Sequence, residues 1–292
     1  MEIKALACER PRGDRGEPLS RFSVTDLLHR LGERALPTSY STLWRLLHAD
    51  AIRPWLHRMW LFPKDPLLLE KAVPILDLYR GQWDGAPLGP GDAVVCADEM
   101  PGLQALGRVV GKGKAEFEYT RNGTTCYLAF WEARTGKVAG EFAPSTGIEP
   151  FERALGHVLE RPWLRDKQRV FLIVDNGSSH HPSTSPGRIA HRFPQVTTVH
   201  LPVHSSWLNQ AEQWFSIVSR KALTPRNFAS TEELERRVLA FEHRWNQDAV
   251  PFKWEFGRER LAQLMAKMGQ KDPLYARHDP AAYHPDNYRT LQ

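Results

Sequence analysis

The sequence predicts an α/β protein in which helices flank a mixed sheet, with a small all-α unit in front of it. Three observations lead to this prediction. Short apolar segments of strand length alternate with helical segments after residue 91. Two short helical patterns with a tight break between them occupy residues 24–49. The stretch 81–91, which is rich in Pro and Gly, separates these two parts of the chain.

Composition narrows the class of protein. Hydrophobic residues make up 41% and charged residues 25% of the 292 positions, which is typical of a globular chain with room for two domains. There is no run of about 18 apolar residues and no apolar signal segment, so we expect neither a membrane span nor secretion. Three widely spaced cysteines argue against a disulfide framework and favour the cytoplasm. The 39 Lys and Arg against 34 Asp and Glu give a net charge of +5, which permits a nucleic-acid partner.

The N-terminal part has the pattern of two short helices. Ser23 and Asp26 form an S-x-x-D capping box, and apolar residues at helical spacing follow over 24–34. The tripeptide at 35–37, Ala-Leu-Pro, ends this helix, and a second runs from Thr38 or Ser39 to about residue 49. Two helices joined in this way are typical of a helix-turn-helix, and an ordinary helical hairpin is the alternative.

Charge favours the DNA-binding interpretation of residues 1–62. This segment carries ten Lys and Arg against seven acidic residues. Ser41 and Arg45 lie near the start of the second helix, where side chains of a recognition helix reach phosphates or base edges. We therefore expect a helix-turn-helix DNA-binding unit over 1–62.

A connecting segment is expected over 63–91. Asp65-Pro66 favours the start of a helix, and Pro74 is expected to kink or end it. Residues 81–91 contain four Gly and two Pro and form the clearest linker in the chain. This division leaves 92–250 as the main domain and 251–292 as a C-terminal tail.

The main domain has a regular succession of elements. Five segments have strand character: 92–97, 124–132, 137–142, 169–174 and 196–201. Helices are expected at 151–164, from Ser205 or Ser206 to Ala222, and from Ser230 to Trp245. A hairpin followed by a helical crossover is compatible with the first and fourth strands lying side by side and parallel.

This order of elements predicts that three acidic residues lie close together. Asp98 and Asp175 come directly after the first and fourth strands, so their side chains are expected at one edge of the sheet. Glu212 lies at the margin of the apolar stripe of the next helix and is expected to face that edge. Each acid taken alone is better explained as a structural cap or a surface carboxylate, and only the conjunction of the three favours a site.

The chemistry of such a cluster follows from charge. Three carboxylates held close together repel one another and remain ionised together when a divalent cation neutralises them. Oxygen ligands of this kind suit Mg²⁺ or Mn²⁺. Two such ions about 4 Å apart can activate a hydroxyl and stabilise the leaving oxygen of a phosphodiester. The pattern therefore favours cleavage or transfer of phosphodiesters.

The stretch L-P-V-H-S-S-W-L-N-Q-A-E-Q-W-F-S, residues 201–216, resembles the signature before the last catalytic acid of DDE transposases of the mariner superfamily, in their bacterial insertion-sequence branch. Further stretches resemble this branch in the same order: L-A-C-E-R-P near the start, S-T-L-W-R-L-L at 41–47, K-D-P at 64–66, A-D-E at 97–99, D-N-G-S-S-H at 175–180 and W-N-Q-D-A-V-P-F-K-W at 245–254. Members of this branch usually carry another helix-turn-helix before the segment matched by 1–60, and this chain departs from that pattern.

The resemblance implies a ribonuclease H-like core in which Asp98, Asp175 and Glu212 form the metal-binding triad for two Mg²⁺ or Mn²⁺ ions. It implies cleavage of DNA at the ends of a mobile element and joining of the freed 3′-hydroxyl to target DNA. The expected partners are transposon-end and target DNA and a second copy of the chain, in a cytoplasmic, nucleoid-associated protein without a small-molecule substrate. A non-catalytic DNA-binding protein and a nuclease that does not join strands are the alternatives.

Other residues are expected near the site or on DNA. Asn176 and His180 match the residues that follow the second acid, although Asn176 can equally form the turn after the strand. Arg220, Lys221 and Arg226 follow the helix of the third acid and can track a DNA backbone, with a solvated basic face as the alternative.

Overall fold

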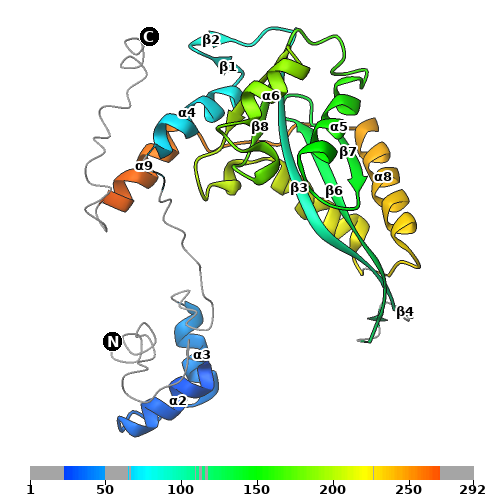
Figure 1. Cartoon of the computed structure of the whole chain (residues 1–292). Helices are drawn as coiled ribbons and strands as arrows, with labels where there is room; N and C mark the ends of the chain where they lie inside the picture. The colour runs from blue at the N-terminus through cyan, green and yellow to red at the C-terminus, as the bar shows by residue number, and fades with distance from the viewer. Residues whose placement is uncertain are drawn as a thin grey trace. The chain divides into compact units, whose positions relative to one another are not determined.

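The computed structural model describes residues 23–49, 65, 67–108, 110–111, 114–115, 118–225 and 227–269. The chain divides into two compact units, Met1–Leu61 and Phe62–Gln292. Each unit is described by itself (Figure 1).

The first unit contains helices α2 (Val24–Glu33) and α3 (Tyr40–Ala49). The predicted capping box of α2 is present: the Ser23 backbone N–H donates to Asp26 Oδ2 over 2.7 Å, and the Asp26 N–H donates to Ser23 Oγ over 3.1 Å. Five buried apolar residues hold the two helices together: Val24, Leu27, Leu31, Leu43 and Leu47. Ser41 and Arg45 lie exposed on α3.

The second unit is built on a five-stranded sheet with the order β7-β6-β3-β8-β9. Its strands are β3 (Asp92–Gly107), β6 (Thr120–Glu132), β7 (Val138–Ala143), β8 (Arg169–Val174) and β9 (Val196–His200). The predicted parallel pairing of the first and fourth long strands is confirmed, from Asp92 opposite Arg169 to Cys96 opposite Ile173. Strand β9 continues the parallel half, whereas β6 and β7 are antiparallel. The predicted mixed sheet is therefore confirmed.

Helices cover both faces of this sheet (Figure 1). Val94 and Cys96 of β3 pack on the side of α4 (Leu68–Tyr79), α7 (Ala211–Val218), α8 (Thr231–Gln247) and α9 (Arg258–Gly269). Ala93, Val95 and Ala97 pack on the other side, against α5 (Ile148–Leu159) and α6 (Ser185–Arg192). This alternation places even-numbered residues of β3 toward α7, because successive side chains of a strand point to opposite faces.

Strand β3 is longer than predicted, since it runs to Gly107 instead of ending at residue 97. Its parallel partner β8 ends earlier, and only the antiparallel ladder with β6 continues, as far as Gly107 opposite Thr120. Two small ladders complete the strands: β1 (Gln82–Trp83) with β2 (Ala86–Pro87), and β4 (Val110–Gly111) with β5 (Lys114–Ala115). The expected linker 81–91 thus contains the β1–β2 hairpin.

Pro74 does not end its helix, because α4 continues to Tyr79. Residues on both sides of it, including Leu69 and Leu76, are buried in the core of the sheet. Burying one such side chain contributes about 1.5–3 kcal/mol, so several together offset the roughly 3 kcal/mol that a proline costs inside a helix. Asp65 does not cap the helix end, although its Oδ1 accepts the Leu67 N–H over 2.9 Å.

The helix of the third acid also differs from the prediction. Residues Ser206–Leu208 form a separate 3₁₀ turn, α7 itself begins at Ala211, and a π-helical turn at Ser219–Leu223 follows it. The expected C-terminal tail contains α9, which buries Leu261 and Met265 in the core. No helix among the described residues is both long and apolar enough to span a bilayer.

Candidate active site

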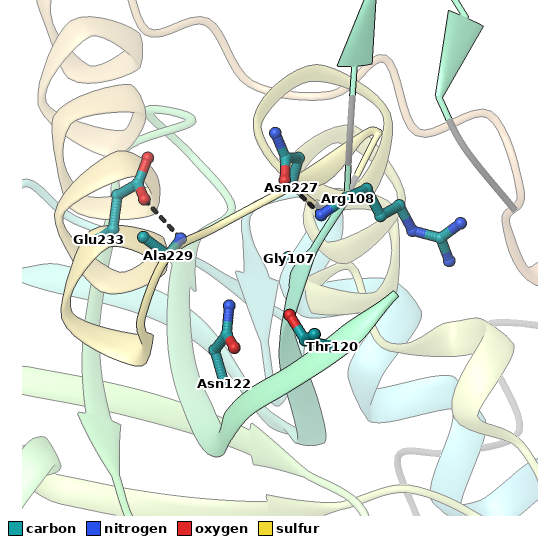
Figure 2. Close-up of a pocket in the computed structure, with 7 residues that line it drawn as sticks. All are labelled: Gly107, Arg108, Thr120, Asn122, Asn227, Ala229 and Glu233. Atoms are coloured by element: carbon teal, nitrogen blue, oxygen red, sulfur yellow. Dashed lines mark hydrogen bonds between the residues drawn. The ribbon is translucent and has the colours of Figure 1, made fainter. Parts of the chain in front are cut away.

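Two places in the second unit could hold a ligand, and they differ in chemistry. One is a cavity of about 540 Å³ between the far end of the β3–β6 ribbon and the start of α8 (Figure 2). Its lining is formed by Gly107, Arg108, Thr120, Asn122, Asn227, Ala229 and Glu233. The Arg108 N–H donates to Asn227 Oδ1 over 2.7 Å and holds the loop to the ribbon, whereas the Ala229 N–H donates to Glu233 Oε2 over 2.7 Å and holds the loop to α8. None of the acidic residues predicted as catalytic lines this cavity.

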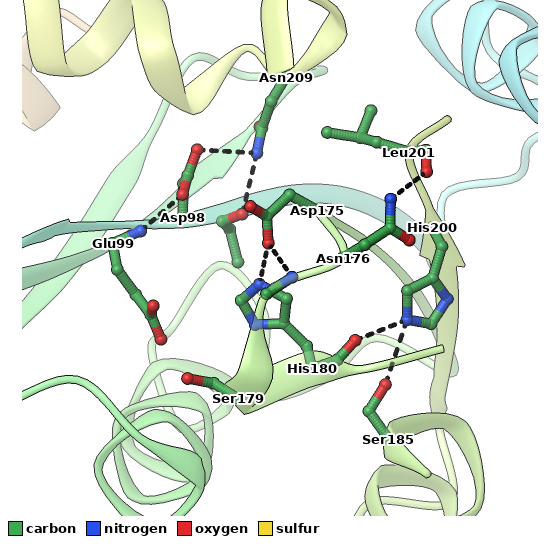
Figure 3. Close-up of polar contacts among 12 residues, drawn as sticks. Asp98, Glu99, Asp175, Asn176, Ser179, His180, Ser185, His200, Leu201 and Asn209 are labelled. Atoms are coloured by element: carbon green, nitrogen blue, oxygen red, sulfur yellow. Dashed lines mark hydrogen bonds and ion pairs between the residues drawn. The ribbon is translucent and has the colours of Figure 1, made fainter. Parts of the chain in front are cut away.

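The other place is the edge of the sheet where the parallel pairing stops (Figure 3). The pairing of β3 with β8 ends at Cys96 and Ile173, and Asp98 and Asp175 follow each by two residues. Both carboxylates continue the series of side chains that faces α7, because the alternation of the two strands is unbroken up to these points. Glu212 lies exposed in the first turn of α7.

Two of the acids affect the third. Burial and the negative charges of Asp175 and Glu212 together raise the pKa of Asp98 to about 7, against a lowering by the hydrogen bond from the Glu99 N–H (2.8 Å). Because a carboxylate affects the pKa of another only when the two lie near each other, this shift indicates that Asp175 and Glu212 lie near Asp98. That the three acids form one metal-binding triad stays a prediction.

Asp175 is held by the turn that follows it. Its Oδ1 accepts the Gly177 N–H over 2.8 Å and forms a short contact with Nε2 of His180 (Figure 3). The His180 hydrogen bond is the main reason why the pKa of Asp175 lies below its usual value. The carboxylate side chain is 41% exposed, whereas the His180 side chain is 1% exposed, so the acid faces outward from a buried support.

Asn209 connects the acid of β3 to the helix of the third acid. Its Nδ2 donates to the Ala97 carbonyl over 3.0 Å and to Asp98 Oδ2 over 3.3 Å, and its Oδ1 accepts the Ala211 N–H over 3.1 Å. The Tyr79 hydroxyl donates to the neighbouring Leu208 carbonyl over 2.7 Å. These bonds fix the start of α7, and therefore Glu212, against β3.

The donor set fits a hard divalent cation. In the described part of the chain, no three His, Cys, Asp or Glu side chains are gathered closely enough to hold a metal ion as they stand. Three carboxylates that repel one another nevertheless offer oxygen ligands alone, which is the chemistry that Mg²⁺ and Mn²⁺ prefer. A cation would also remove the repulsion that raises the pKa of Asp98.

The remaining predicted residues lie in three different places. Asn176 donates from Nδ2 to the Leu201 carbonyl over 2.9 Å and so ties the ends of β8 and β9 together. Arg220 and Lys221 are exposed on the π-helical turn after α7, and Arg226 lies outside the described residues. Two tryptophans that were not among the predicted residues flank the start of α7: Trp214 is fully buried, whereas Trp207 is 39% exposed and meets Phe256 edge-on.

Asn209 and His200 were missed as residues of the site. Asn209 stands inside the W-L-N stretch of the 201–216 motif, so the motif contained a signal for it. His200 lies at the end of β9, with Nε2 2.9 Å from the His180 carbonyl oxygen and 3.1 Å from Ser185 Oγ (Figure 3). Nothing in its local sequence indicates this contact, because both partners come from elements that precede it in the chain.

Comparison with known proteins agrees with this site. The family described as DDE superfamily endonuclease matches residues 94–235, a stretch that contains all three acids. This part of the chain is therefore similar to a DDE-type endonuclease domain, and its five-stranded mixed sheet has a ribonuclease H-like strand order. No curated protein matches the chain.

Solved structures similar to this chain include two complexes of one transposase. The Mos1 transposase paired-end complex with the left transposon end has 14% identity and a TM-score of 0.49, over 77% of this chain and 72% of that one. The Mos1 mariner paired end complex with Mn has 14% identity and a TM-score of 0.49, over 86% of this chain and 79% of that one.

Proposed function

We propose that this protein is a transposase of the mariner superfamily, of the type found in bacterial insertion sequences. It cleaves DNA at the ends of its element and joins the freed 3′-hydroxyl to target DNA. The observation that supports the proposal is the effect of the Asp175 and Glu212 charges on the pKa of Asp98 at one sheet edge, inside the stretch that matches the endonuclease family. The proposal also includes that the protein acts as a nucleoid-associated dimer bound to transposon-end and target DNA.

In this proposal Asp98, Asp175 and Glu212 are the residues that would hold two Mg²⁺ or Mn²⁺ ions. Bound in this way, divalent ions activate the attacking hydroxyl and stabilise the charge on the leaving oxygen of a phosphodiester. His180 keeps the carboxylate of Asp175 in place, since its ring is buried and its Nε2 contacts that carboxylate. Asn209 does the same for Asp98 and for the start of α7.

DNA contacts outside the acid cluster form the second part of the proposal. The unit at 1–62 recognises the ends of the element as a helix-turn-helix, with Ser41 and Arg45 on the exposed side of α3. Arg220, Lys221 and Arg226 follow the DNA backbone after the helix of Glu212. The segment 63–91 connects this unit to the catalytic domain at 92–250, and 251–292 follows it.

Nicking of supercoiled DNA by the purified full-length chain tests the catalytic role. We expect nicking with Mg²⁺ or Mn²⁺, none with EDTA, and a loss of at least about 100-fold for Asp175→Asn, because several kcal/mol of charge stabilisation disappear with the ligand. Equal nicking by wild type and Asp175→Asn would refute the assignment.

Two further measurements separate the alternatives. Incubation of a pre-cut element end with target plasmid should give joined products, and cutting without joining would identify a nuclease instead. Calorimetric titration with Mg²⁺ up to about 10 mM should give a binding signal, because carboxylate oxygens are the ligands of this ion. DNA binding without that signal would identify a non-catalytic DNA-binding protein.

A further inference from the structure

The turn that supports Asp175 is not stable without contacts from other parts of the chain. Residues Ser178–His180 form a single 3₁₀ turn of three residues, and no side chain caps its start. One such turn is unstable alone, since few hydrogen bonds compensate for the backbone entropy that is lost. The position of His180, and with it the carboxylate of Asp175, therefore depends on contacts from outside the turn.

Two side chains from other elements bind the backbone of this turn. Arg188 of α6 donates from Nη2 to the Ser179 carbonyl over 2.6 Å. His200 of β9 places Nε2 2.9 Å from the His180 carbonyl oxygen (Figure 3). The ring of His180 packs on Phe151 of α5, with 5.0 Å between the ring centroids. Arg188 is the charged member of this set, and a charge-assisted bond is stronger than a neutral one.

A buried acid fixes Arg188 in turn. Glu152 of α5 is 6% exposed, and its Oε1 pairs with Nε of Arg188. Its Oε2 pairs with Nη1 of Arg192 over 3.1 Å. A guanidinium presents several donors in one plane, so Arg188 can bond Glu152 and the Ser179 carbonyl at the same time.

The two arginines differ in a way that separates support of the site from support of the fold. Both pair with Glu152 and both come from α6, one helical turn apart. Arg188 alone of the two has a bond to the 178–180 turn among the contacts of the described residues. Removal of either weakens the pairing with Glu152, whereas removal of Arg188 also releases the turn.

We propose that Arg188 is a positioning residue of the metal site, which acts through the Ser179 carbonyl, the 178–180 turn and His180 on the carboxylate of Asp175. This inference rests on the proposed function, because it assumes that Asp175 binds a divalent cation. Outer contacts of this kind orient a ligand before the ion arrives, and their removal weakens metal binding without removing any ligand.

The test is Mn²⁺ affinity, measured by electron paramagnetic resonance on the full-length chain, with thermal unfolding of each variant as a second readout. Arg188→Ala should weaken Mn²⁺ binding by about 10- to 100-fold, the loss that removal of an outer partner typically causes. Arg192→Ala should leave the Mn²⁺ affinity at the wild-type value, although it lowers the unfolding temperature as well. Equal Mn²⁺ affinities of Arg188→Ala and Arg192→Ala would overturn the proposal.

Arg188→Lys protects the test against a variant that does not fold. Lysine keeps the charge beside Glu152, but its single ammonium does not reproduce the planar fork that reaches both partners. A folded Arg188→Lys protein should still bind Mn²⁺ more weakly than wild type, and wild-type affinity would refute the positioning role. If wild-type protein itself binds no Mn²⁺, the proposed function fails first, which is a different result from a variant that matches a binding wild type.

Discussion

The β3–β8 strand pair has acidic residues at both ends, and their pKa values are shifted in opposite directions. At the start of β3 and β8, Asp92 lies opposite Arg169, and the two pair through Nε to Oδ1 (3.0 Å) and Nη2 to Oδ2 (3.1 Å). This pairing is the main reason why the pKa of Asp92 is lowered. Six residues along, past the carboxyl end of the parallel pairing, Asp98 is half-buried near two other acids and has its pKa raised to about 7.

The difference separates acids that support the fold from acids that support a function. A carboxylate with its own arginine stabilises the native state, whereas carboxylates placed near one another lower its stability. Folded proteins keep such unfavourable arrangements mainly where a ligand or a reaction needs them. The comparison therefore points to the edge with Asp98 as the place where a cation binds, although both edges contain acids.

The largest effect is expected when one acid at each end of the strand pair is neutralised, because this tests directly whether the two ends differ in function. Asp98→Asn should reduce metal-dependent nicking by at least about 100-fold, because a cation ligand that stabilises charge in the transition state is lost. Asp92→Asn is the matched control, since it removes an acid of the same strand and leaves the proposed ligands in place. The measurement is the initial rate of nicking of supercoiled DNA with Mn²⁺. Equal losses in both variants would mean that the two ends do not differ in function.

Much of this contrast could be predicted from the sequence, because it follows from strand order. The apolar run at 169–174 ends at an acid. The hairpin and the helical crossover before it are compatible with parallel pairing between this run and 92–97. The capping box at Ser23 and the cap of α8 at Ser230 were equally readable, since each is a local pattern. Local chemistry and connectivity were enough for these features.

Features that depend on tertiary contacts could not be predicted. Helix α6 is short and largely polar and was not predicted, although Arg188 on it reaches the turn beside Asp175. The extension of β3 to Gly107 depends on its pairing with β6. The helix through Pro74 depends on the core that both of its halves enter. In each case a distant partner supplies the free energy that the local sequence lacks.

Glu242 extends the comparison, because it is a buried acid that is not part of the proposed site. Glu242 of α8 is 6% exposed and accepts a hydrogen bond from the Tyr127 hydroxyl over 3.0 Å. Burial raises its pKa to about 7, against lowering by that bond and by the charge of Arg161. In the unfolded chain its pKa is about 4.3. The native state therefore binds the proton more tightly, and stability from this group is lost as pH rises from about 4.3 to 7.

Glu242→Gln removes this dependence on pH. The variant and wild type should have similar unfolding free energies near pH 4, and the variant should be more stable by about 1–3 kcal/mol at pH 8. Urea unfolding at several pH values, with EDTA present, measures the difference. Glu232→Gln is the control on the same helix, since Glu232 is solvent-exposed and its pKa is lowered instead. A constant difference between Glu242→Gln and wild type across this pH range would show that burial of an unpaired acid has no cost here.

The smallest expected effect is at the paired end. Arg169→Met removes the charge beside Asp92 and also the guanidinium that lies over the ring of Phe171. The Arg169 side chain is 45% exposed, so the pair should contribute only about 0.5–1 kcal/mol, and less in high salt. Because the folded pKa of Asp92 is lowered, this contribution is present above the unfolded pKa of about 3.9 and is lost as pH falls through the lower folded value. Urea unfolding of wild type and variant at pH 7 and at pH 2.5, each in low and high salt, measures this contribution. A difference that persists at pH 2.5 would assign the effect to the contact with Phe171 instead of the pairing with Asp92. The opposite pH trends expected for Asp92 and Glu242 have two causes: Asp92 is paired with an arginine, whereas Glu242 is buried.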